Sequence, residues 1–332
     1  MRVAPSLEIA VHESSQVGAA RRSIADLGLR CGFDEIASGN LAIVVNELAS
    51  NLVKHAHDGF LIVRELESGG VPILEILSLD RGPGIFDVDQ CLADGFSTTG
   101  TAGTGMGAVR RLTASWDIFS MPGSGTVQVA RVSAKRLPSS PAATVAGISI
   151  PAPGEVECGD AWASFRDGSL IRLLVADGLG HGPAAAIAAR EAVQSFVSRP
   201  QCPPAEMITF THAALRSTRG AAIAIAEIDP VRRSVRFAGV GNIAAQIVSP
   251  LKRQNLVSLN GTVGAQLPTP REFVYELPDS AILCCWSDGI TSRAGVENYA
   301  GLLHRDPALV AAVLYRDFKR GRDDATVAVC RI

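Results

Sequence analysis

A short proline- and serine-rich stretch at residues 136–144 divides this 332-residue chain into two parts. It reads Arg-Leu-Pro-Ser-Ser-Pro-Ala-Ala-Thr and has no apolar periodicity, which is typical of a linker. Apolar segments alternate on both sides of it, and no internal repeat relates the two parts. We therefore predict two domains of different kind, residues 1–136 and 145–332, joined by a linker at 137–144.

The composition is that of a globular protein without a strongly charged surface. Hydrophobic residues make up 47% and charged residues 19% of the chain, and the formal net charge is -2. This balance gives no electrostatic reason to expect nucleic acid or an anionic membrane as partner. The seven cysteines form no C-x-x-C pair, which favours buried thiols over a zinc site or a disulfide framework. Since no signal segment or run of about 18 apolar residues is evident, we expect a cytoplasmic protein.

The first part mixes helix-type and strand-type patterns. Apolar residues recur at i, i+4, i+7 and i+11 from Leu41, which predicts an amphipathic helix over 41–56. The other elements expected here are strands at 60–67 and 73–79, a helix at 104–114, and a closing hairpin of strands at 116–121 and 125–134. This order predicts an α+β sandwich with helices on one face of a sheet.

Strands dominate the second part. The clearest strand-like runs are 170–176, 221–229, 234–239, 244–248, 281–286 and 325–332. Alanine-rich helices are expected at 183–197 and 205–216. The order predicts a β-sandwich flanked by helices, so the fold class of the whole chain is α+β.

Three polar segments of the first part follow one another in a suggestive order. Glu47, Asn51 and His55 recur at i, i+4 and i+8 on the helix predicted at 41–56; alone, such a row is most simply a solvated face. The strand at 73–79 then runs into Asp-Arg-Gly-Pro-Gly at 80–84. The sequence Gly-Thr-Gly-Met-Gly at 103–107 opens the next helix, whose backbone N–H groups can receive phosphates. Their order predicts a nucleotide site.

Residues 10–135 resemble the GHKL ATPase fold, in particular its small serine-kinase branch of anti-sigma factor kinases and stressosome kinases. The resemblance lies in Asn-Glu-Leu-Ala-Ser-Asn at 46–51, in both glycine-rich turns and in the turn at 123–126. It implies that Asn51 binds Mg²⁺, that Asp80 accepts a hydrogen bond from the adenine amino group, and that Glu47 orients or deprotonates a serine hydroxyl. The ATP-lining residues it implies are Gly82, Gly84, Gly103, Gly105, Gly107 and Thr126.

Five aspartates of the second part stand beside glycine or at the ends of predicted strands. They are Asp160, Asp177, Asp288, Asp323 and Asp324. Each Asp-Gly pair alone is an ordinary turn, but carboxylates at adjoining strand ends can converge on Mg²⁺ or Mn²⁺. Two such cations could lower the pKa of a shared water and supply a nucleophile toward a phosphate.

Residues from about 154 to the end resemble the SpoIIE/RsbX branch of the type 2C metal-dependent protein phosphatases. The most specific match is Ala-Asp-Gly-Leu-Gly-His-Gly-Pro at 176–183, followed by Ser-Asp-Gly at 287–289 and Asp-Asp-Ala-Thr at 323–326. The resemblance implies a metal site made by the side chains of Asp160, Asp177, Asp288 and Asp323 and by the carbonyl of Gly178. Alignment with the terminal motif favours Asp323 over Asp324.

Two further features of the second part are interpreted more simply. His181 lies in a glycine-rich turn, so a structural role is favoured over the alternative of a general acid. The turn Gly-Val-Gly-Asn at 239–242 also resembles the family, and we assign it no chemistry.

Together the two resemblances imply a partner-switching enzyme that uses ATP, Mg²⁺ and Mn²⁺. Its phosphatase domain would act on phosphoserine or phosphothreonine of a STAS-domain protein, an anti-sigma antagonist or stressosome component, and its kinase domain would phosphorylate such a protein. A sigma factor is a further candidate partner. One alternative keeps the phosphatase alone, with the first domain sensing nucleotide or binding a partner. Another is a non-enzymatic scaffold, which predicts a degraded metal site and is disfavoured by the five aspartates.

Overall fold

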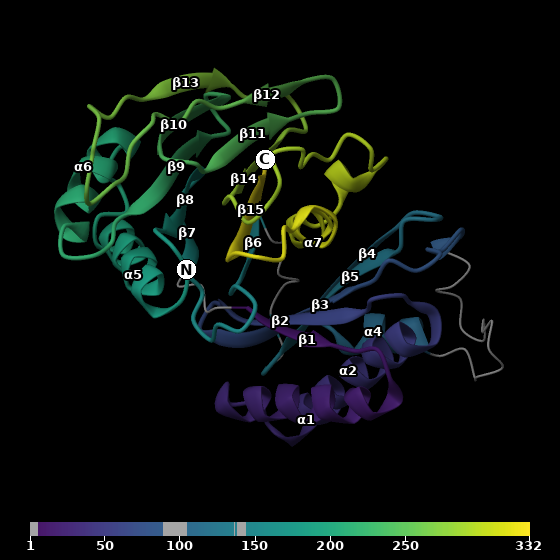
Figure 1. Cartoon of the computed structure of the whole chain (residues 1–332). Coiled ribbons are helices and arrows are strands. Elements are labelled where there is room, and N and C mark those ends of the chain that lie inside the picture. Colours follow the sequence, from purple (N-terminus) through teal and green to yellow (C-terminus); the bar gives the residue numbers. More distant parts are fainter. Residues whose placement is uncertain (1–5, 89–104, 136, 138–143) are drawn as a thin grey trace. The chain divides into compact units, whose positions relative to one another are not determined.

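The computed structural model describes residues 6–88, 105–135, 137 and 144–332. These residues form two compact units, 6–143 and 144–332 (Figure 1). Both units contain helices and strands, which confirms the predicted α+β class. Residues 138–143 of the predicted linker lie outside the described residues.

The first unit is one antiparallel sheet with helices on one face (Figure 1). The strand order is β1-β2-β3-β5-β4. The strands are β1 (Leu7–Ala10), β2 (Phe60–Ser68), β3 (Val71–Leu79), β4 (Ser115–Ser120) and β5 (Thr126–Ser133). The helices are α1 (Ser14–Arg30), α2 (Glu35–His55) and α4 (Gly105–Leu112).

The core of this unit forms between the helices and every second residue of the strands. Val63 and Ile76 point to the helical face and pack with Leu41 and Leu48 of α2. Helix α2 begins six residues before the predicted start, because the side chain of Asp34 caps it by accepting a hydrogen bond from the Ala37 backbone N–H at 2.8 Å. By length and a mean hydropathy of 1.2, α2 is apolar enough to cross a membrane, yet its apolar side is part of this folded core.

The other face of the sheet carries a buried ion network. Glu75 on β3 lies opposite Arg64 on β2 and opposite Arg131 on β5. The Nε atom of Arg64 is 2.5 Å from one Glu75 carboxylate oxygen, and Nη2 of Arg131 is 2.7 Å from the other. Burial raises the pKa of Glu75, but the two arginines outweigh it and hold that pKa below its usual value.

The second unit is a sandwich of two antiparallel sheets. Their strand orders are β13-β10-β9-β8-β7 and β12-β11-β14-β15-β6. The strands of the first sheet are β7 (Asp160–Asp167), β8 (Leu170–Gly178), β9 (Ala221–Asp229), β10 (Ser234–Val240) and β13 (Phe273–Glu276). Those of the second are β6 (Val145–Ile150), β11 (Ala244–Val248), β12 (Arg253–Asn255), β14 (Ile282–Trp286) and β15 (Ala325–Arg331).

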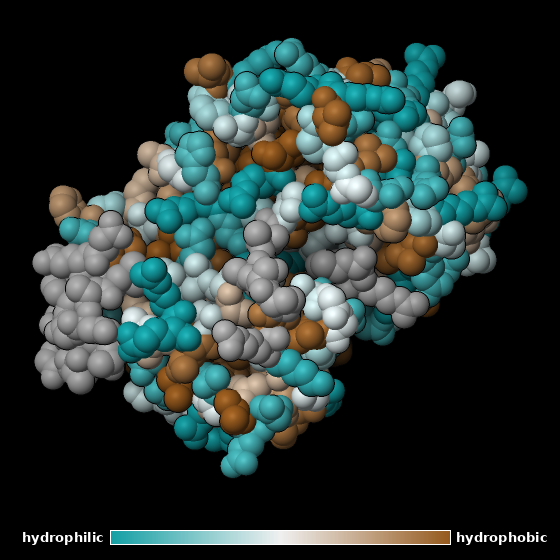
Figure 2. All heavy atoms as spheres, turned by 180° about the vertical axis from the view of Figure 1, so that it is seen from behind, coloured by the Kyte–Doolittle hydropathy of each residue, from teal (hydrophilic) through white to brown (hydrophobic). Residues whose placement is uncertain are grey.

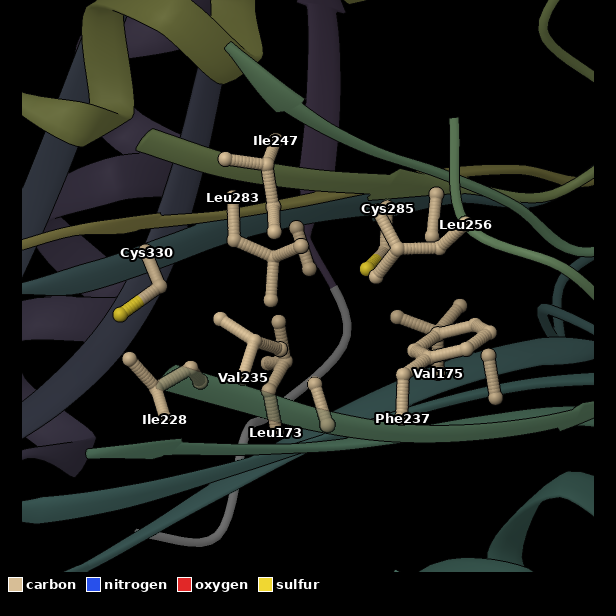
Figure 3. Packing of buried hydrophobic residues seen from close by; sticks show 14 of the residues in the cluster. Leu173, Val175, Ile228, Val235, Phe237, Ile247, Leu256, Leu283, Cys285 and Cys330 are labelled. Carbon is tan, nitrogen blue, oxygen red and sulfur yellow. The ribbon is translucent and has the colours of Figure 1, made fainter. Parts of the chain in front are cut away.

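The main core of this unit lies between the two sheets. Leu173, Val175 and Phe237 of the first sheet point toward Leu283 and Cys285 of the second (Figure 3). Outside the first sheet pack α5 (Pro183–Ser198) and α6 (Pro204–Leu215), and α7 (Pro307–Phe318) packs on β6 and β15. A short 3-10 helix, η1 (Leu302–His304), precedes α7. The predicted β-sandwich flanked by helices is thus present.

The sequence failed to predict several elements: α1, β1, β6, β7, β12, β13, η1 and α7. Helix α7 was missed because ten of its residues, from Pro307 to Arg316, are buried, so it has no alternation of polar and apolar faces. Helix α1 was missed for the opposite reason, since it buries only Ala20, Ile24 and Gly28. On the face drawn in Figure 2, hydrophobic residues lie interspersed among hydrophilic ones.

Two candidate functional sites

In the first unit, the carboxylate of Asp80 ties the first glycine-rich turn to the sheet. Asp80 follows the last residue of β3. Its Oδ1 atom accepts hydrogen bonds from the backbone N–H of Gly82 at 2.7 Å and of Thr126 at 3.2 Å. Its own N–H donates to the Thr126 carbonyl at 3.0 Å. Two of the residues predicted to contact the nucleotide, Asp80 and Thr126, therefore lie side by side.

The glycines of this turn permit a close approach of three backbone segments. Gly84 has φ +73°, and a Cβ atom there would lie 2.3 Å from the carbonyl oxygen of Met121. A Cβ atom on Gly82 would lie 2.7 Å from the carbonyl oxygen of His55, at the end of α2. The turn is thus packed between the end of α2 and the β4–β5 turn, where no side chain larger than hydrogen fits.

Ser120 belongs to the same site and was not singled out from the sequence. Its Oγ atom accepts a hydrogen bond from the Ile85 backbone N–H at 2.7 Å and lies 2.8 Å from Oγ1 of Thr126. A serine in the last position of a strand gives no sequence signal, because its role depends on the two turns that meet there.

Helix α2 brings Glu47 to the start of α4, where the described part of the second glycine-rich turn lies. Oε2 of Glu47 lies 2.8 Å from the position that a Cβ atom on Gly105 would occupy, so this carboxylate lies against the start of α4. Asn51 is one turn further along α2 and half-buried, whereas His55 is exposed. Gly107 lies in the first turn of α4, and Gly103 lies outside the described residues. The roles of these residues toward ATP stay predictions.

In the second unit, Asp160 and Asp177 form the centre of the carboxylate site. Asp160 opens β7, Asp177 lies near the end of β8, and the two residues are directly opposite in the strand pairing. Asp160 is only 4% exposed, and its Oδ2 atom accepts a hydrogen bond from Oγ of Ser287 at 2.5 Å. Ser287 follows β14 of the other sheet, so the site lies where strands of both sheets begin or end.

Asp288 enters the same site from the second sheet. Its Oδ2 atom accepts a hydrogen bond from Nδ2 of Asn242 at 2.6 Å. The sequence alone indicates no chemistry for Ser287 or for the turn at 239–242, although both lie in family-like motifs. The structure assigns Asn242 to the support of Asp288 and Ser287 to the support of Asp160.

The two neighbouring aspartates just before β15 differ in their surroundings. Asp324 is buried, and its Oδ1 atom accepts a hydrogen bond from the Ala152 backbone N–H at 2.8 Å. Asp323 is half-buried, and its Oδ1 atom accepts a hydrogen bond from the Asp324 N–H at 2.9 Å. These contacts give Asp324 a structural anchor inside the loop network. That Asp323 is the metal ligand of the pair stays a prediction.

The carboxylates of this site disturb one another electrostatically. Burial, followed by the charges of Asp288, Asp323 and Asp324, raises the pKa of Asp177 to about 7. Burial and the charges of Asp177 and Asp324 raise the pKa of Asp160 well above its usual range. Burial and the charge of Asp323 raise the pKa of Asp288 as well. A set of carboxyl groups that resist ionisation together is a site that favours an added positive charge.

Two buried oxygen atoms bear on whether divalent cations fit here. Within the described residues, Oδ2 of Asp177 and Oδ2 of Asp324 are buried without a hydrogen-bond partner. Buried carboxylate oxygens normally have a partner, and a hard divalent cation is one that carboxylates prefer. No three acidic, histidine or cysteine side chains of the described residues are close enough together to form a closed metal cage. The donor chemistry fits Mg²⁺ or Mn²⁺, with some ligand movement needed to close the shell.

Gly178 ends β8, and His181 lies in the loop that connects β8 to α5. A Cβ atom on Gly178 would lie 2.2 Å from the carbonyl oxygen of Ala185, so glycine is required for α5 to pack against this loop. Nδ1 of His181 is 2.7 Å from Oε1 of Glu155, and the histidine side chain is 60% exposed. This pair links two loops at the edge of the site, which suits the structural interpretation of His181.

Comparison with known proteins finds two family models in the chain. A model described as "Histidine kinase-like ATPase domain" matches residues 11–131, and a model described as "Stage II sporulation protein E (SpoIIE)" matches residues 167–332. The serine/threonine-protein kinase RsbT of Bacillus subtilis (strain 168) is 32% identical over 108 residues, which cover 32% of this chain and 81% of RsbT.

Solved structures resemble the phosphatase-like part. One, described as "The bacterial stressosome: a modular system that has been adapted to control secondary messenger signaling", is 29% identical with a TM-score of 0.53 and covers 57% of this chain and 98% of that chain. The structure of RsbX in complex with magnesium is 18% identical with a TM-score of 0.51 and covers 56% of this chain and 94% of that chain. At this lower identity, the likeness to RsbX concerns the fold alone.

Proposed function

The chain belongs to the SpoIIE family and carries a histidine kinase-like ATPase domain before its phosphatase domain, and we propose that it is a two-way switch on a partner protein. The phosphatase domain removes phosphate from a serine or threonine, and the kinase-like domain adds it. The observation that carries this proposal is the cluster of Asp160, Asp177 and Asp288 with its raised carboxyl pKa values and unpartnered buried oxygens.

For the phosphatase reaction, Asp160, Asp177, Asp288, Asp323 and the carbonyl of Gly178 would hold Mg²⁺ or Mn²⁺. Such cations neutralise charge on the phosphoryl group and make water a better nucleophile. The protein's own groups position these ligands: Ser287 orients Asp160, and Asn242 orients Asp288. The packing of α5 against Gly178 keeps the loop after Asp177 in place.

For the kinase reaction, the residues around Asp80 would bind the adenine and those of α2 would act at the phosphates. Asp80 is held by two backbone N–H groups, so it is oriented before a nucleotide arrives. The carboxylate of Glu47, on α2, lies against the start of α4. The backbone N–H groups at the N-terminus of a helix favour phosphate there. A carboxylate there can accept the proton of an attacking serine hydroxyl, and Asn51 would hold Mg²⁺.

We propose a STAS-domain protein as the partner. Two similarities support this choice: RsbT is described as a serine/threonine-protein kinase, and one similar structure is described as a stressosome structure. A cytoplasmic location is consistent with this partner and is part of the same proposal.

The alternative is a phosphatase with a nucleotide-binding module that does not transfer phosphate. The contacts of Asp80, Gly82 and Gly84 would serve nucleotide binding equally well without chemistry at Glu47. Only the fate of the partner's phosphate separates the two functions.

The test is intact-mass analysis of a purified STAS-domain protein incubated with this protein. One reaction starts from the unphosphorylated partner with Mg²⁺ and ATP, and the other from the phosphorylated partner with Mn²⁺. We expect a gain of phosphate that Glu47→Gln abolishes and a loss of phosphate that Asp177→Asn abolishes. Loss without gain would support the alternative, and no change in either reaction would contradict the proposed function for that partner.

A further inference from the structure

The carboxylate site has to receive a phosphoryl group that itself carries negative charge. Four or five aspartates repel such a group unless positive charge is placed beside them. Cations bound by the aspartates supply part of this charge. A positively charged side chain that borders the site and is not already engaged could supply the rest.

Arg320 lies at such an edge, beside Asp288. Its backbone N–H donates to the carbonyl of Gly289 at 2.8 Å, and Lys319 pairs with Ile290 in an isolated β-bridge. The chain leaving α7 therefore runs antiparallel to the residues that follow Asp288. Gly289 directly follows Asp288, so this backbone contact places Arg320 beside the aspartate.

Arg316 and Lys319, two other cations of the same segment, are engaged elsewhere. Nη2 of Arg316 pairs with Asp317 at 2.7 Å, and Nζ of Lys319 lies 4.6 Å from the centre of the Tyr315 ring. Arg320 is exposed, and its side chain forms no hydrogen bond or ion pair with any described residue. An exposed arginine without a partner is common on protein surfaces, so its position beside Asp288 is what gives it meaning.

We propose that Arg320 binds the phosphoryl group of the substrate and so takes part in substrate binding by the phosphatase site. The backbone contact with Gly289 fixes where the side chain starts. The planar guanidinium can then donate two parallel hydrogen bonds to phosphoryl oxygens, which a lysine cannot do. This inference rests on the proposed phosphatase function and adds a residue that the aspartate motifs do not contain.

The test compares wild type with Arg320→Ala and Arg320→Lys, using p-nitrophenyl phosphate and a phosphoserine peptide in Mn²⁺. Losing a charge-assisted contact should raise KM for both substrates by roughly tenfold or more, and the inhibition constant of inorganic phosphate should rise by the same factor. The KM and the inhibition constant of Arg320→Lys should lie between those of wild type and those of Arg320→Ala. Arg232→Ala is the matched control, because Arg232 is 84% exposed on the turn between β9 and β10.

Three results would overturn the inference. These are KM and phosphate inhibition unchanged within twofold in Arg320→Ala, an effect confined to the peptide, or an equal effect in Arg232→Ala. Calorimetric binding of inorganic phosphate to the Mn²⁺-loaded protein needs no turnover, so it tests Arg320 even if the phosphatase function fails. If Mn²⁺ raises the Tm of Arg320→Ala as much as that of wild type, the alanine variant is folded. If the alanine variant does not fold, the KM and phosphate inhibition of Arg320→Lys decide the question instead.

Discussion

The two candidate sites are built on opposite principles. The site around Asp80 is made by backbone groups brought close together, with glycines where a side chain would collide. The site around Asp177 is made by negatively charged side chains at the strand ends of two sheets. One is a steric arrangement, and the other is an electrostatic one.

This difference shows what each site still needs. In the first site, Oδ1 of Asp80 already accepts hydrogen bonds from two backbone N–H groups, so this atom is satisfied by the protein itself. In the second site, Asp177 has a buried oxygen without a partner and a pKa raised to about 7. Divalent cations should therefore change the stability of the second site far more than that of the first.

The strongest test of this contrast is Asp177→Asn. We expect hydrolysis of p-nitrophenyl phosphate in Mn²⁺ to fall by roughly a thousandfold, or about 4 kcal/mol of transition-state stabilisation. Mn²⁺ should raise the Tm of the wild-type phosphatase unit, because a ligand that binds only the folded state stabilises it, and this rise should largely disappear in the variant.

The control for that experiment is the protein without metal. There, Asp177→Asn should be at least as stable as wild type, since it removes one of several mutually repelling carboxylates. A metal-dependent rise in Tm as large in the variant as in wild type would contradict the proposed role of Asp177.

The second prediction concerns Glu75, a carboxylate whose neighbours lower its pKa instead of raising it. Glu75 is fully buried between Arg64 and Arg131, and Glu75→Gln should lower the free energy of unfolding at pH 7 by about 3–5 kcal/mol. Because the folded-state pKa of Glu75 lies below its unfolded value, its ionisation stabilises the protein at neutral pH, and this stability is lost as the pH falls through the folded-state pKa.

Urea unfolding of the first unit at several pH values measures both effects. The exposed Glu67 on the neighbouring strand β2 is the matched control, and Glu67→Gln should change the free energy of unfolding by less than about 0.5 kcal/mol. Equal losses in both variants, or a Glu75→Gln variant with the acid dependence of wild type, would contradict the interpretation of the network.

The sequence predicted the two sites unequally, and the reason is physical. Asp177, Asp288 and Asp323 could be found because an acidic residue at the end of an apolar strand stands out in the sequence. Asn242 and Ser287 could not be assigned a role, because a short polar residue in a turn looks the same whether it faces solvent or a carboxylate. Their partners are 46 and 127 residues away. The pairing of β11 with β14 brings Asn242 to Asp288, and the packing of the two sheets brings Ser287 to Asp160.

The same reasoning applies to the elements that the sequence missed. Helix α7 is buried nearly all round, and α1 buries only three residues, so neither has the balanced amphipathic pattern on which the prediction relied. The elements that were predicted, such as α2 and β3, each combine a regular apolar pattern with a clear turn at one end.

The third prediction tests the steric character of the first site. Gly84→Ala should destabilise the first unit by about 2–3 kcal/mol, because it adds a collision with the Met121 carbonyl to an unfavourable positive φ. It should also remove the rise in Tm that ATP gives, while hydrolysis of p-nitrophenyl phosphate by the second unit is kept. Gly69→Ala is the control, since Gly69 has φ +57° but no atom within 4 Å of a Cβ, and it should cost about 1 kcal/mol without affecting nucleotide binding. Similar losses in the two variants would show that backbone strain, rather than the close approach, decides the effect.

The smallest expected effect is that of Asn242→Ala, which removes the donor to Asp288 and leaves every carboxylate in place. Since groups that orient metal ligands typically contribute a factor of ten to a hundred, we expect the Mn²⁺ concentration for half-maximal activity to rise by about tenfold. Saturating Mn²⁺ should restore most of kcat, which it cannot do for Asp177→Asn.

Asn242→Asp provides the sharper comparison, because it nearly keeps the shape of the side chain but adds another negative charge to carboxylates that already repel one another. If the alanine variant needs no more Mn²⁺ than wild type, the hydrogen bond to Asp288 has no part in metal binding. The second site would then depend on its charges alone.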